Sequence, residues 1–442
     1  MPTIAPQSAS PAPPLLKRVW LALVLLGFAG QLAWAVENQF FNTFLYDTIT
    51  PNPRAISWMV AASAVTATVT TLLMGTLSDR TRSRWGRRRP FLLLGYLAWG
   101  VCTALFPTAA VFRPVGLAVT MAILFDCIMT FFGSTANDAA LNAYVTDVTT
   151  LQNRGRVSGV LQIMTWLAIL IVYGGAGLVI ELLGYDAFFY LIGGLVFLLG
   201  LIGGLLVREP PAGERPAGGY WRQIADTFRW RNLVANRDFF LVLMGISLWA
   251  VAQNIFFPYL LIYLQHYLEL GTAESSAIIA LTILLGGIVL AYPLGLLADR
   301  WGRRPVALLA IVLEMAGLFA FSFARSLPAL AITGILWLAP LTAWTVTTGA
   351  WSKDLFPEDK RGQFAGYYLF FWVAVPMILG PITGGWLATE YGIPTVLQGQ
   401  AGFIPTPILF RVAAFFTLAA ALPLLFTGRR VRENSPAGPT EG

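Results

Sequence analysis

Residues 75–90 read "GTLSDRTRSRWGRRRP", and residues 295–305 repeat most of this stretch as "GLLADRWGRRP". The two copies differ by the segment "TRSR" and one further arginine, both in the first copy. Each copy directly follows an apolar run of helical length, so each is expected to form the loop that leaves a helix. A loop sequence that recurs after the same kind of helix indicates an internal repeat, which constrains the whole fold.

A second pair of matching positions supports this repeat. Asp147 stands seven residues before Arg154, which a glycine follows. Asp354 stands seven residues before Arg361, which a glycine also follows. The sequence therefore predicts two copies of one unit, over residues 17–207 and 238–428. The remaining segments are predicted to be a disordered tail (1–16), a linker with a helix along the membrane interface (208–237) and a second tail (429–442).

The composition indicates which solvent surrounds these units. Of the 442 residues, 57% are hydrophobic and 12% are charged, which is about half the charge of a soluble domain. Twelve apolar runs are long enough to cross a bilayer, six in each copy. The fold class is therefore predicted to be an all-α membrane protein, with twelve transmembrane helices in two pseudo-symmetric six-helix bundles.

The basic residues indicate the orientation in the membrane. With the N-terminus in the cytoplasm, that side holds every lysine and arginine except Arg54, Arg113, Arg325 and Arg411. Because basic residues gather in cytoplasmic loops, both termini are predicted to be cytoplasmic and the protein to lie in the cell membrane. The same distribution accounts for the net charge of +7, so no nucleic-acid partner is expected.

The sequence lacks the motifs of an ATP-driven or hydrolytic protein. A phosphate-binding loop needs a Gly-Lys pair, and none of the lysines at 17, 353 and 360 follows a glycine. The single histidine, His266, excludes most zinc-hydrolase motifs. We expect no catalytic residue, no cofactor and no metal site, and we expect a monomer surrounded by membrane lipid.

The duplicated motif, with the pattern G-x-L-x-D-R-x-G-R-R, resembles that of the major facilitator superfamily. The segment "TRSRWGRRRPFLLLG" is similar to the glycoside–pentoside–hexuronide:cation symporters and to the sucrose-transporter-like branch, and "GQLAWAVENQFF" is similar to the latter. The resemblance implies a secondary transporter that moves a small polar solute, such as a glycoside or sugar, by alternating access. An exporter of amphiphilic drugs or lipids by proton antiport, a uniporter and a non-transporting sensor stay open as alternatives.

The duplicated loops are expected to act in gating. Asp79 and Asp299 end a helix at the cytoplasm, where topology alone needs no carboxylate. We expect them to pair with arginines and to latch the two halves together when the outer side is open, and we expect the motif glycines to permit close helix approach. The expected gating residues are Gly75, Asp79, Arg87, Arg88, Asp147, Arg154, Gly295, Asp299, Arg303, Asp354 and Arg361.

Carboxylates inside apolar helices are the candidates for proton coupling, because a charge at the bilayer centre costs about 2.5–3.5 kcal/mol. Glu37, Asp126 and Asp138 are the three candidates, and depth in the membrane favours Asp126 over Asp138. The resemblance bears on the choice of ion, since sodium-coupled glycoside symporters carry two aspartates in helix 2. This chain has Ala67 and Thr71 there, which favours protons.

Amide and aromatic side chains near these carboxylates are the candidates for solute binding. Four of them recur at steps of three and four along the first helix, so they share one face. Buried amides also join helices by hydrogen bonds, and this interpretation stays open. Glu314, on a helix expected at the periphery, is interpreted as structural. The expected binding residues are Gln31, Trp34, Asn38, Asn42, Gln162, Gln253, Asn254, Trp344 and Tyr367.

Overall fold

A computed structural model describes residues 15–150, 153–209, 237–355 and 367–427. The predicted linker helix, both predicted tails and Arg361 therefore lie outside the described residues. Nothing is described of the side chains of Gly295 and Asp299 either.

The N-terminal half is helical throughout its described length. Its elements are α1 (Lys17–Val36), η1 (Glu37–Phe41), α2 (Asn42–Phe44), η2 (Leu45–Ile49), α3 (Pro53–Arg80), α4 (Arg89–Leu105), η3 (Phe106–Val111), α5 (Val115–Gly133), η4 (Ser134–Leu141), α6 (Asn142–Val148) and α7 (Arg154–Leu206). The segments η1, η2 and η4 are π-helical turns that continue a helix without ending it. α1 and α5 are in this way extended into spans of 33 and 34 residues.

The long element α7 is a hairpin of two membrane spans. Its backbone leaves helical geometry at Gly184, where φ is 83°. Leu161 lies against Gly27 and Gly203 lies against Leu26, so both arms of α7 pack on neighbouring residues of α1. A straight helix would separate two residues 42 positions apart by about 60 Å. Eleven helices among the described residues can span a membrane by length and composition, and counting α7 twice confirms the predicted twelve.

The C-terminal half repeats this helical plan and adds one small sheet. Its elements are α10 (Arg237–Phe256), η5 (Phe257–Tyr259), α11 (Leu260–Ile262), η6 (Tyr263–Tyr267), α12 (Thr272–Thr282), η7 (Ile283–Val289), α13 (Leu290–Trp301), α14 (Arg303–Phe321), α15 (Leu327–Asp354), η9 (Phe370–Ala374), α17 (Val375–Glu390), β1 (Ile393–Leu397), β2 (Gln400–Ile404), α18 (Ile408–Ala419) and α19 (Ala421–Leu425). β1 and β2 form an antiparallel hairpin. The sequence analysis expected only a loop between the last two spans.

The geometry of the two halves reproduces the sequence repeat. Gly86 and Gly302 both have a positive φ, 107° and 90°, just before the arginines of each motif. In the first half, Arg87 pairs with Asp147 at 2.5 Å. In the second half, the corresponding pair joins Arg303 and Asp354 at 3.5 Å. The same local bridge therefore links the duplicated loop to the end of the following span pair in each copy.

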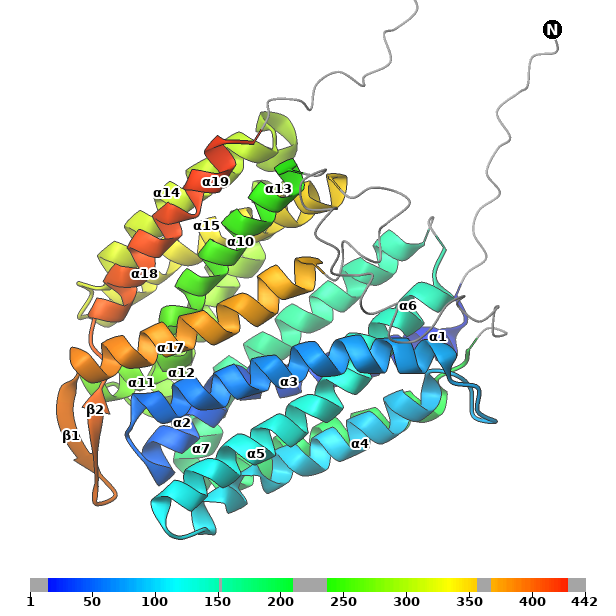
Figure 1. Cartoon of the computed structure of the whole chain (residues 1–442), viewed down its shortest axis with the longest axis horizontal. Coiled ribbons are helices and arrows are strands. Elements are labelled where there is room, and N and C mark those ends of the chain that lie inside the picture. The colour runs from blue at the N-terminus through cyan, green and yellow to red at the C-terminus, as the bar shows by residue number, and fades with distance from the viewer. Residues whose placement is uncertain (1–14, 151–152, 210–236, 356–366, 428–442) are drawn as a thin grey trace, which may run out of the picture.

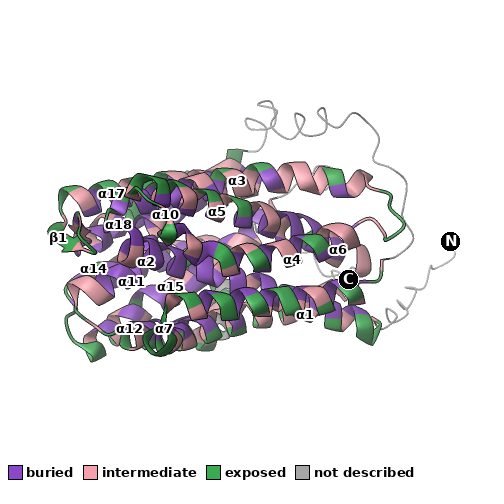
Figure 2. Ribbon diagram, turned by 90° about the horizontal axis from the view of Figure 1, so that it is seen from below, coloured by how far each residue is buried: buried purple, intermediate pink, exposed green. Residues whose placement is uncertain are grey.

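The two halves meet at one end of the molecule and diverge toward the other (Figure 1). We call the meeting end, which carries β1 and β2, the hairpin end, and the opposite end the basic end. At the hairpin end, Ser57 of α3 bonds Tyr259 at 2.9 Å and the Pro381 carbonyl at 2.8 Å. Buried residues line the interior of both bundles, whereas exposed residues lie on the outer helix faces (Figure 2). Many of these exposed residues are large and apolar, as a lipid-facing surface requires.

Candidate functional site

A cavity lies between the two halves, beyond the contacts of the hairpin end. It holds about 360 Å³ of space outside protein atoms. The residues that line it come from α1 and its extension, α3, α5, α10, η5 and α17: they are Glu37, Asn38, Asn42, Met59, Val60, Ser63, Asp126, Asn254, Phe257, Pro258 and Met377. The cavity therefore brings together five of the residues that the sequence analysis selected.

Glu37 and Asp126 form the acidic floor of this cavity. The Ser63 hydroxyl donates to Oε1 of Glu37 at 2.8 Å, and the Thr130 hydroxyl donates to the same oxygen at 3.1 Å. Ser63 and Thr130 are also within 2.6 Å of each other. Oε2 of Glu37 and Oδ1 of Asp126 receive no hydrogen bond from any described residue. The two carboxyl groups are buried neighbours that interact with each other.

The chemistry of such a pair is restricted. Two adjacent carboxylates cannot both stay ionised cheaply in a buried site, because each charge opposes the other and both lose hydration. A shared proton relieves both costs. The site can therefore hold and release one proton without any basic side chain in its lining.

Asp138 is not part of this floor. It lies on the π-helical segment η4, where Asn137 donates to its Oδ1 at 3.0 Å. Tyr96 donates to the side-chain amide oxygen of Asn137 at 3.1 Å and so extends this separate cluster toward α4. Asp138 therefore does not line the cavity, although it is near enough to Glu37 for the two charges to interact.

The amides of the first span are fixed by their own helix. Asn38 Nδ2 donates to the Trp34 carbonyl at 2.8 Å, and Asn42 Nδ2 donates to the Asn38 carbonyl at 2.9 Å. Asn254 in the other half donates to the Ala250 carbonyl at 2.9 Å in the same way. Each amide uses one of its two N–H groups in this way, which leaves the amide oxygen to accept from a solute and the second N–H to donate to one.

The other expected binding residues do not line the cavity. Gln31 is half-buried, and Gln162 is exposed on α7. Trp34 packs on Trp99, with ring centroids 4.8 Å apart. Trp344 and Tyr367 belong to the packed core of the C-terminal half, so a direct contact with solute is not available to them in this arrangement.

Several polar contacts of the site could not be found from sequence. Ser63 was not selected, although it stands between both carboxyls, because a serine in an apolar helix is not a signal by itself. Gln39 Nε2 donates across the two halves to the Phe257 carbonyl at 2.6 Å. The π-helical turn at Glu37–Phe41 widens the helix at this point, and such turns gather at functional sites. No pattern of residues in the sequence predicts the extra residue in this π-helical turn.

A second inter-half contact lies at the hairpin end, around Asp47. Tyr185 donates to Oδ2 of Asp47 at 2.5 Å, and His266 Nε2 lies 2.8 Å from Oδ1. Tyr185 and Asp47 belong to the N-terminal half, whereas His266 belongs to the C-terminal half. The β-hairpin adds a further contact between the halves, because Tyr46 of the N-terminal half donates to the Phe403 carbonyl of β2 at 2.9 Å.

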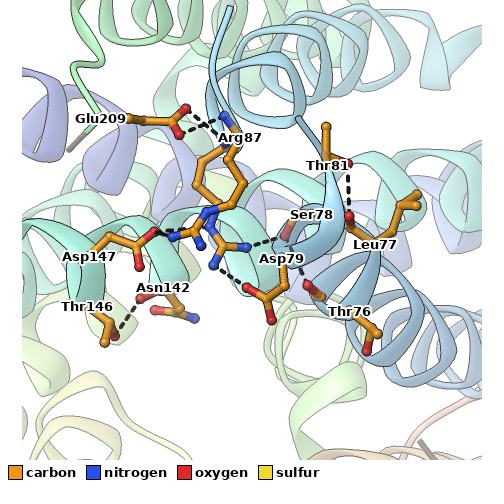
Figure 3. Close-up of polar contacts among 12 residues, drawn as sticks. Thr76, Leu77, Ser78, Asp79, Thr81, Arg87, Asn142, Thr146, Asp147 and Glu209 are labelled. Carbon is orange, nitrogen blue, oxygen red and sulfur yellow. Dashed lines mark hydrogen bonds and ion pairs between the residues drawn. The ribbon is translucent and has the colours of Figure 1, made fainter. Parts of the chain in front are cut away.

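Four of the expected gating residues of the first half, Asp79, Arg87, Arg88 and Asp147, form one cluster at the basic end (Figure 3). Arg88, which is buried, pairs with Asp79, donates to Ser78 Oγ at 2.5 Å and bonds Asp147 at 3.2 Å. Glu209 accepts three backbone N–H groups at 2.7–2.8 Å, from residues 87, 88 and 89. It therefore caps the start of α4 with a negative charge, where the helix dipole favours one. Sequence reasoning missed this residue.

Two expectations about this end do not describe the observed arrangement. Among the described contacts, Asp79 bonds Arg88 of its own half, so its expected latch to the other half is not seen at this end, where the described parts of the halves diverge. A Cβ placed on Gly75 would meet no described atom within 4 Å, so Gly75 is not a point of close approach. Arg154 donates to the Thr149 hydroxyl at 3.2 Å. A latch in a state with this end closed stays a prediction.

Comparison with known proteins agrees with this architecture. The Major Facilitator Superfamily model matches residues 19–292 and 268–442. An uncharacterized MFS-type transporter, YfkF of Bacillus subtilis, is 32% identical over 33% of this chain and 36% of its own. A D-xylose transporter of Levilactobacillus brevis is 26% identical over 34% of this chain and 32% of its own. The alignments thus span about a third of these relatives.

Solved structures extend the likeness to the whole fold. A point mutant of the nucleoside transporter NupG superposes with a TM-score of 0.73 and 15% identity, over 92% of this chain and 99% of that one. A bacterial homolog of the human lysosomal transporter Spinster, in an inward-facing and unoccupied conformation, superposes with a TM-score of 0.61 and 15% identity, over 93% and 94% of the two chains. This chain has two six-helix halves, a duplicated loop motif and a family match along almost its whole length. It therefore belongs to the major facilitator superfamily.

Proposed function

We propose that this chain is a proton-coupled symporter that takes up a small polar solute, a glycoside or sugar, across the cell membrane. The observation that carries the proposal is the cavity between the halves, where the carboxyls of Glu37 and Asp126 lie beside amides from both halves. A site between two bundles that meet at one end is placed to open alternately to either side.

Proton coupling follows from the pair of carboxyls. With one proton shared, the pair carries a single negative charge, and with a second proton it is neutral. A neutral pair no longer opposes passage of the loaded site through the low-dielectric state in which both ends are closed. The Ser63 and Thr130 hydroxyls would hold Glu37 in place while the protonation state changes.

A hydroxylated solute suits the remaining lining. The amide oxygens of Asn38, Asn42 and Asn254 are acceptors for hydroxyl protons, and Phe257, Met59 and Met377 offer apolar surface. The partial similarity to a D-xylose transporter supports a sugar.

We also propose that both termini are cytoplasmic, so that the basic end faces the cytoplasm and the cavity is open to that side. Among the described residues, the arginines at 54, 113, 325 and 411 lie at the hairpin end, and the other lysines and arginines lie at the basic end. An arrangement closed at the hairpin end is then the inward-facing one. A monomer suffices for this mechanism, because the site lies inside one chain.

The test is uptake into sealed vesicles that contain the purified protein. Uptake of labelled D-xylose and sucrose should follow an imposed pH gradient and should not respond to sodium at fixed membrane potential. Strict sodium dependence would contradict proton coupling. Indifference to sugars together with transport of hydrophobic cations would favour an exporter of amphiphiles, for which an apolar pocket of about 390 Å³ beside Phe257, Leu260 and Trp337 offers a place.

A further inference from the structure

The second half contains a modified copy of the segment that carries Glu37. Residues 34–41 read "WAVENQFF" and residues 249–257 read "WAVAQNIFF". Trp249 corresponds to Trp34, and Ala252 stands where the first copy has its glutamate. The segment 249–257 has therefore no carboxyl of its own.

A carboxyl reaches this place from another helix. Glu314 of α14 is fully buried, with no exposed surface. Trp249 Nε1 donates to its Oε2 at 2.8 Å, and Gln253 Nε2 donates to its Oε1 at 2.7 Å. Trp249 and Gln253 lie one turn apart and so present both donors on one face of α10. Glu314 thus bonds two residues of a neighbouring helix, and both lie beside the residues that line the cavity.

These bonds fix the orientation of the Gln253 amide. Gln253 meets Glu314 with its NH₂ group, whose nitrogen lies 2.7 Å from Oε1. The bond to Glu314 then holds the amide oxygen on the opposite side, so that the oxygen and the nitrogen of the amide do not exchange places. Gln253 is only half-buried, and its neighbour Asn254 lines the central cavity.

The same carboxyl fixes one end of a row of aromatic rings. Trp249 stacks on Trp372 with centroids 5.7 Å apart and planes 22° apart. Trp372 stacks in turn on Tyr368 at 5.9 Å and 10°. Trp372 and Tyr368 are half-buried. The orientation of the Trp249 ring therefore constrains the orientation of Trp372 and Tyr368, whose rings are partly accessible.

A purely stabilising role explains this arrangement poorly. Apolar residues of similar volume often stabilise a buried site as well as ionic groups or better. What Glu314 adds is orientation, because it accepts from Trp249 and Gln253 and so fixes which atoms these two side chains present elsewhere.

We propose that Glu314 is a positioning residue of the solute site. It orients the Gln253 amide and, through Trp249, the Trp372–Tyr368 stack, so that the second half offers a hydroxyl acceptor and a flat aromatic surface. The hydroxyl acceptor can bind the polar edge of a sugar ring, and the aromatic surface can pack on its apolar face. This inference rests on the proposed function, because it assigns the part of the solute that the C-terminal half contacts.

The test compares sugar affinity with thermal stability in purified full-length protein. Glu314→Gln places the NH₂ group of the new amide against one of the two donors, Trp249 or Gln253. The affinity for D-xylose or sucrose should therefore fall by at least tenfold, and the melting temperature should also fall. The exchange variant Gln253→Glu with Glu314→Gln restores a carboxylate–amide pair but removes the amide from α10. It should recover the melting temperature and not the affinity. Recovery of both would overturn the proposal, since any bonded pair would then suffice.

Two further measurements keep the test decisive. If the exchange variant does not recover stability, Gln253→Ala decides, because it removes the presented amide and leaves Glu314 bonded to Trp249. A tenfold loss of affinity supports the proposal, and unchanged affinity overturns it. If the wild type binds neither sugar, the proposed function fails separately. Positioning is then read by near-UV circular dichroism, where Glu314→Gln should remove the signal that Trp249→Phe removes, and an unchanged spectrum would count against it.

Discussion

Glu37 illustrates what a single residue reveals in sequence and what it does not. A glutamate inside an apolar span is a visible signal, because its charge is expensive there. Its partners are not visible: Asp126 is 89 positions away, and Ser63 and Thr130 are ordinary residues of membrane helices. The candidate carboxyls and the preference for Asp126 over Asp138 could therefore be obtained from the sequence, whereas the hydrogen bonds from Ser63 and Thr130 to Glu37 needed the packing of the helices.

Glu37→Gln should separate binding from coupling. Glutamine keeps the hydrogen-bonding capacity of the site but cannot change its charge, so the variant should still bind solute and exchange it across the membrane. It should fail to concentrate solute against a gradient. Counterflow and pH-driven uptake in the same vesicles measure the two activities.

Two comparisons sharpen this test. Asp138→Asn is the matched control, because Asp138 lies outside the cavity, and it should keep accumulation. The neighbouring Asn38→Leu should instead weaken binding itself, by about 1–3 kcal/mol for a buried partner left unsatisfied. If Glu37→Gln still accumulated solute under a pH gradient, Glu37 would not be the coupling residue, and the role would be assigned to Asp126.

At the scale of elements, the sequence predicts what length and composition decide. The spans could be located because an apolar run of about 20 residues has few other uses. The β-hairpin at 393–404 could not, since its strands are five residues long and contain Pro394 and Gly402. The π-helical turns were missed for another reason: one extra residue per turn leaves the composition of a helix unchanged.

The start of α4 offers a prediction about one element. Glu209→Gln replaces an acceptor of three backbone N–H groups by an amide whose NH₂ opposes them. The free energy of unfolding should fall by about 1–2 kcal/mol, as for the loss of a helix cap. Thermal unfolding in detergent measures this change. Asp186→Asn is a matched control, because that carboxylate is exposed on α7, and an equal effect in both variants would contradict the capping role.

At the scale of the whole molecule, the repeat predicts two similar halves but not the angle between them. The bridges Arg87–Asp147 and Arg303–Asp354 lie within single halves, so they persist when the halves move as rigid bodies. The contacts that decide the angle are those between halves, and they lie at the hairpin end. Their residues, such as Ser57 and Gln39, show no pattern in sequence, because each is defined only by the partner that it meets.

Asp47 supplies the prediction at this scale. Its carboxylate bonds His266 of the other half and Tyr185 of its own. Asp47→Asn should weaken the closure of the hairpin end by about 1 kcal/mol, which changes the ratio of closed to open molecules about fivefold. Tyr185→Phe removes a bond within one half only and should leave that ratio unchanged.

The ratio can be measured by spin labels on the two halves. Val111 and Val396 are exposed by 79% and 68% and lie at this end on opposite halves, so cysteines there accept labels once Cys102 and Cys127 are replaced. Pulsed electron–electron double resonance should show a larger population of long distances in Asp47→Asn than in the parent or in Tyr185→Phe. Transport should change with it, because a carrier that closes the hairpin end less often returns less often to the inward-facing state. Identical distance distributions in all three proteins would mean that closure at this end depends on the packing around Ser57 and not on the contact between Asp47 and His266.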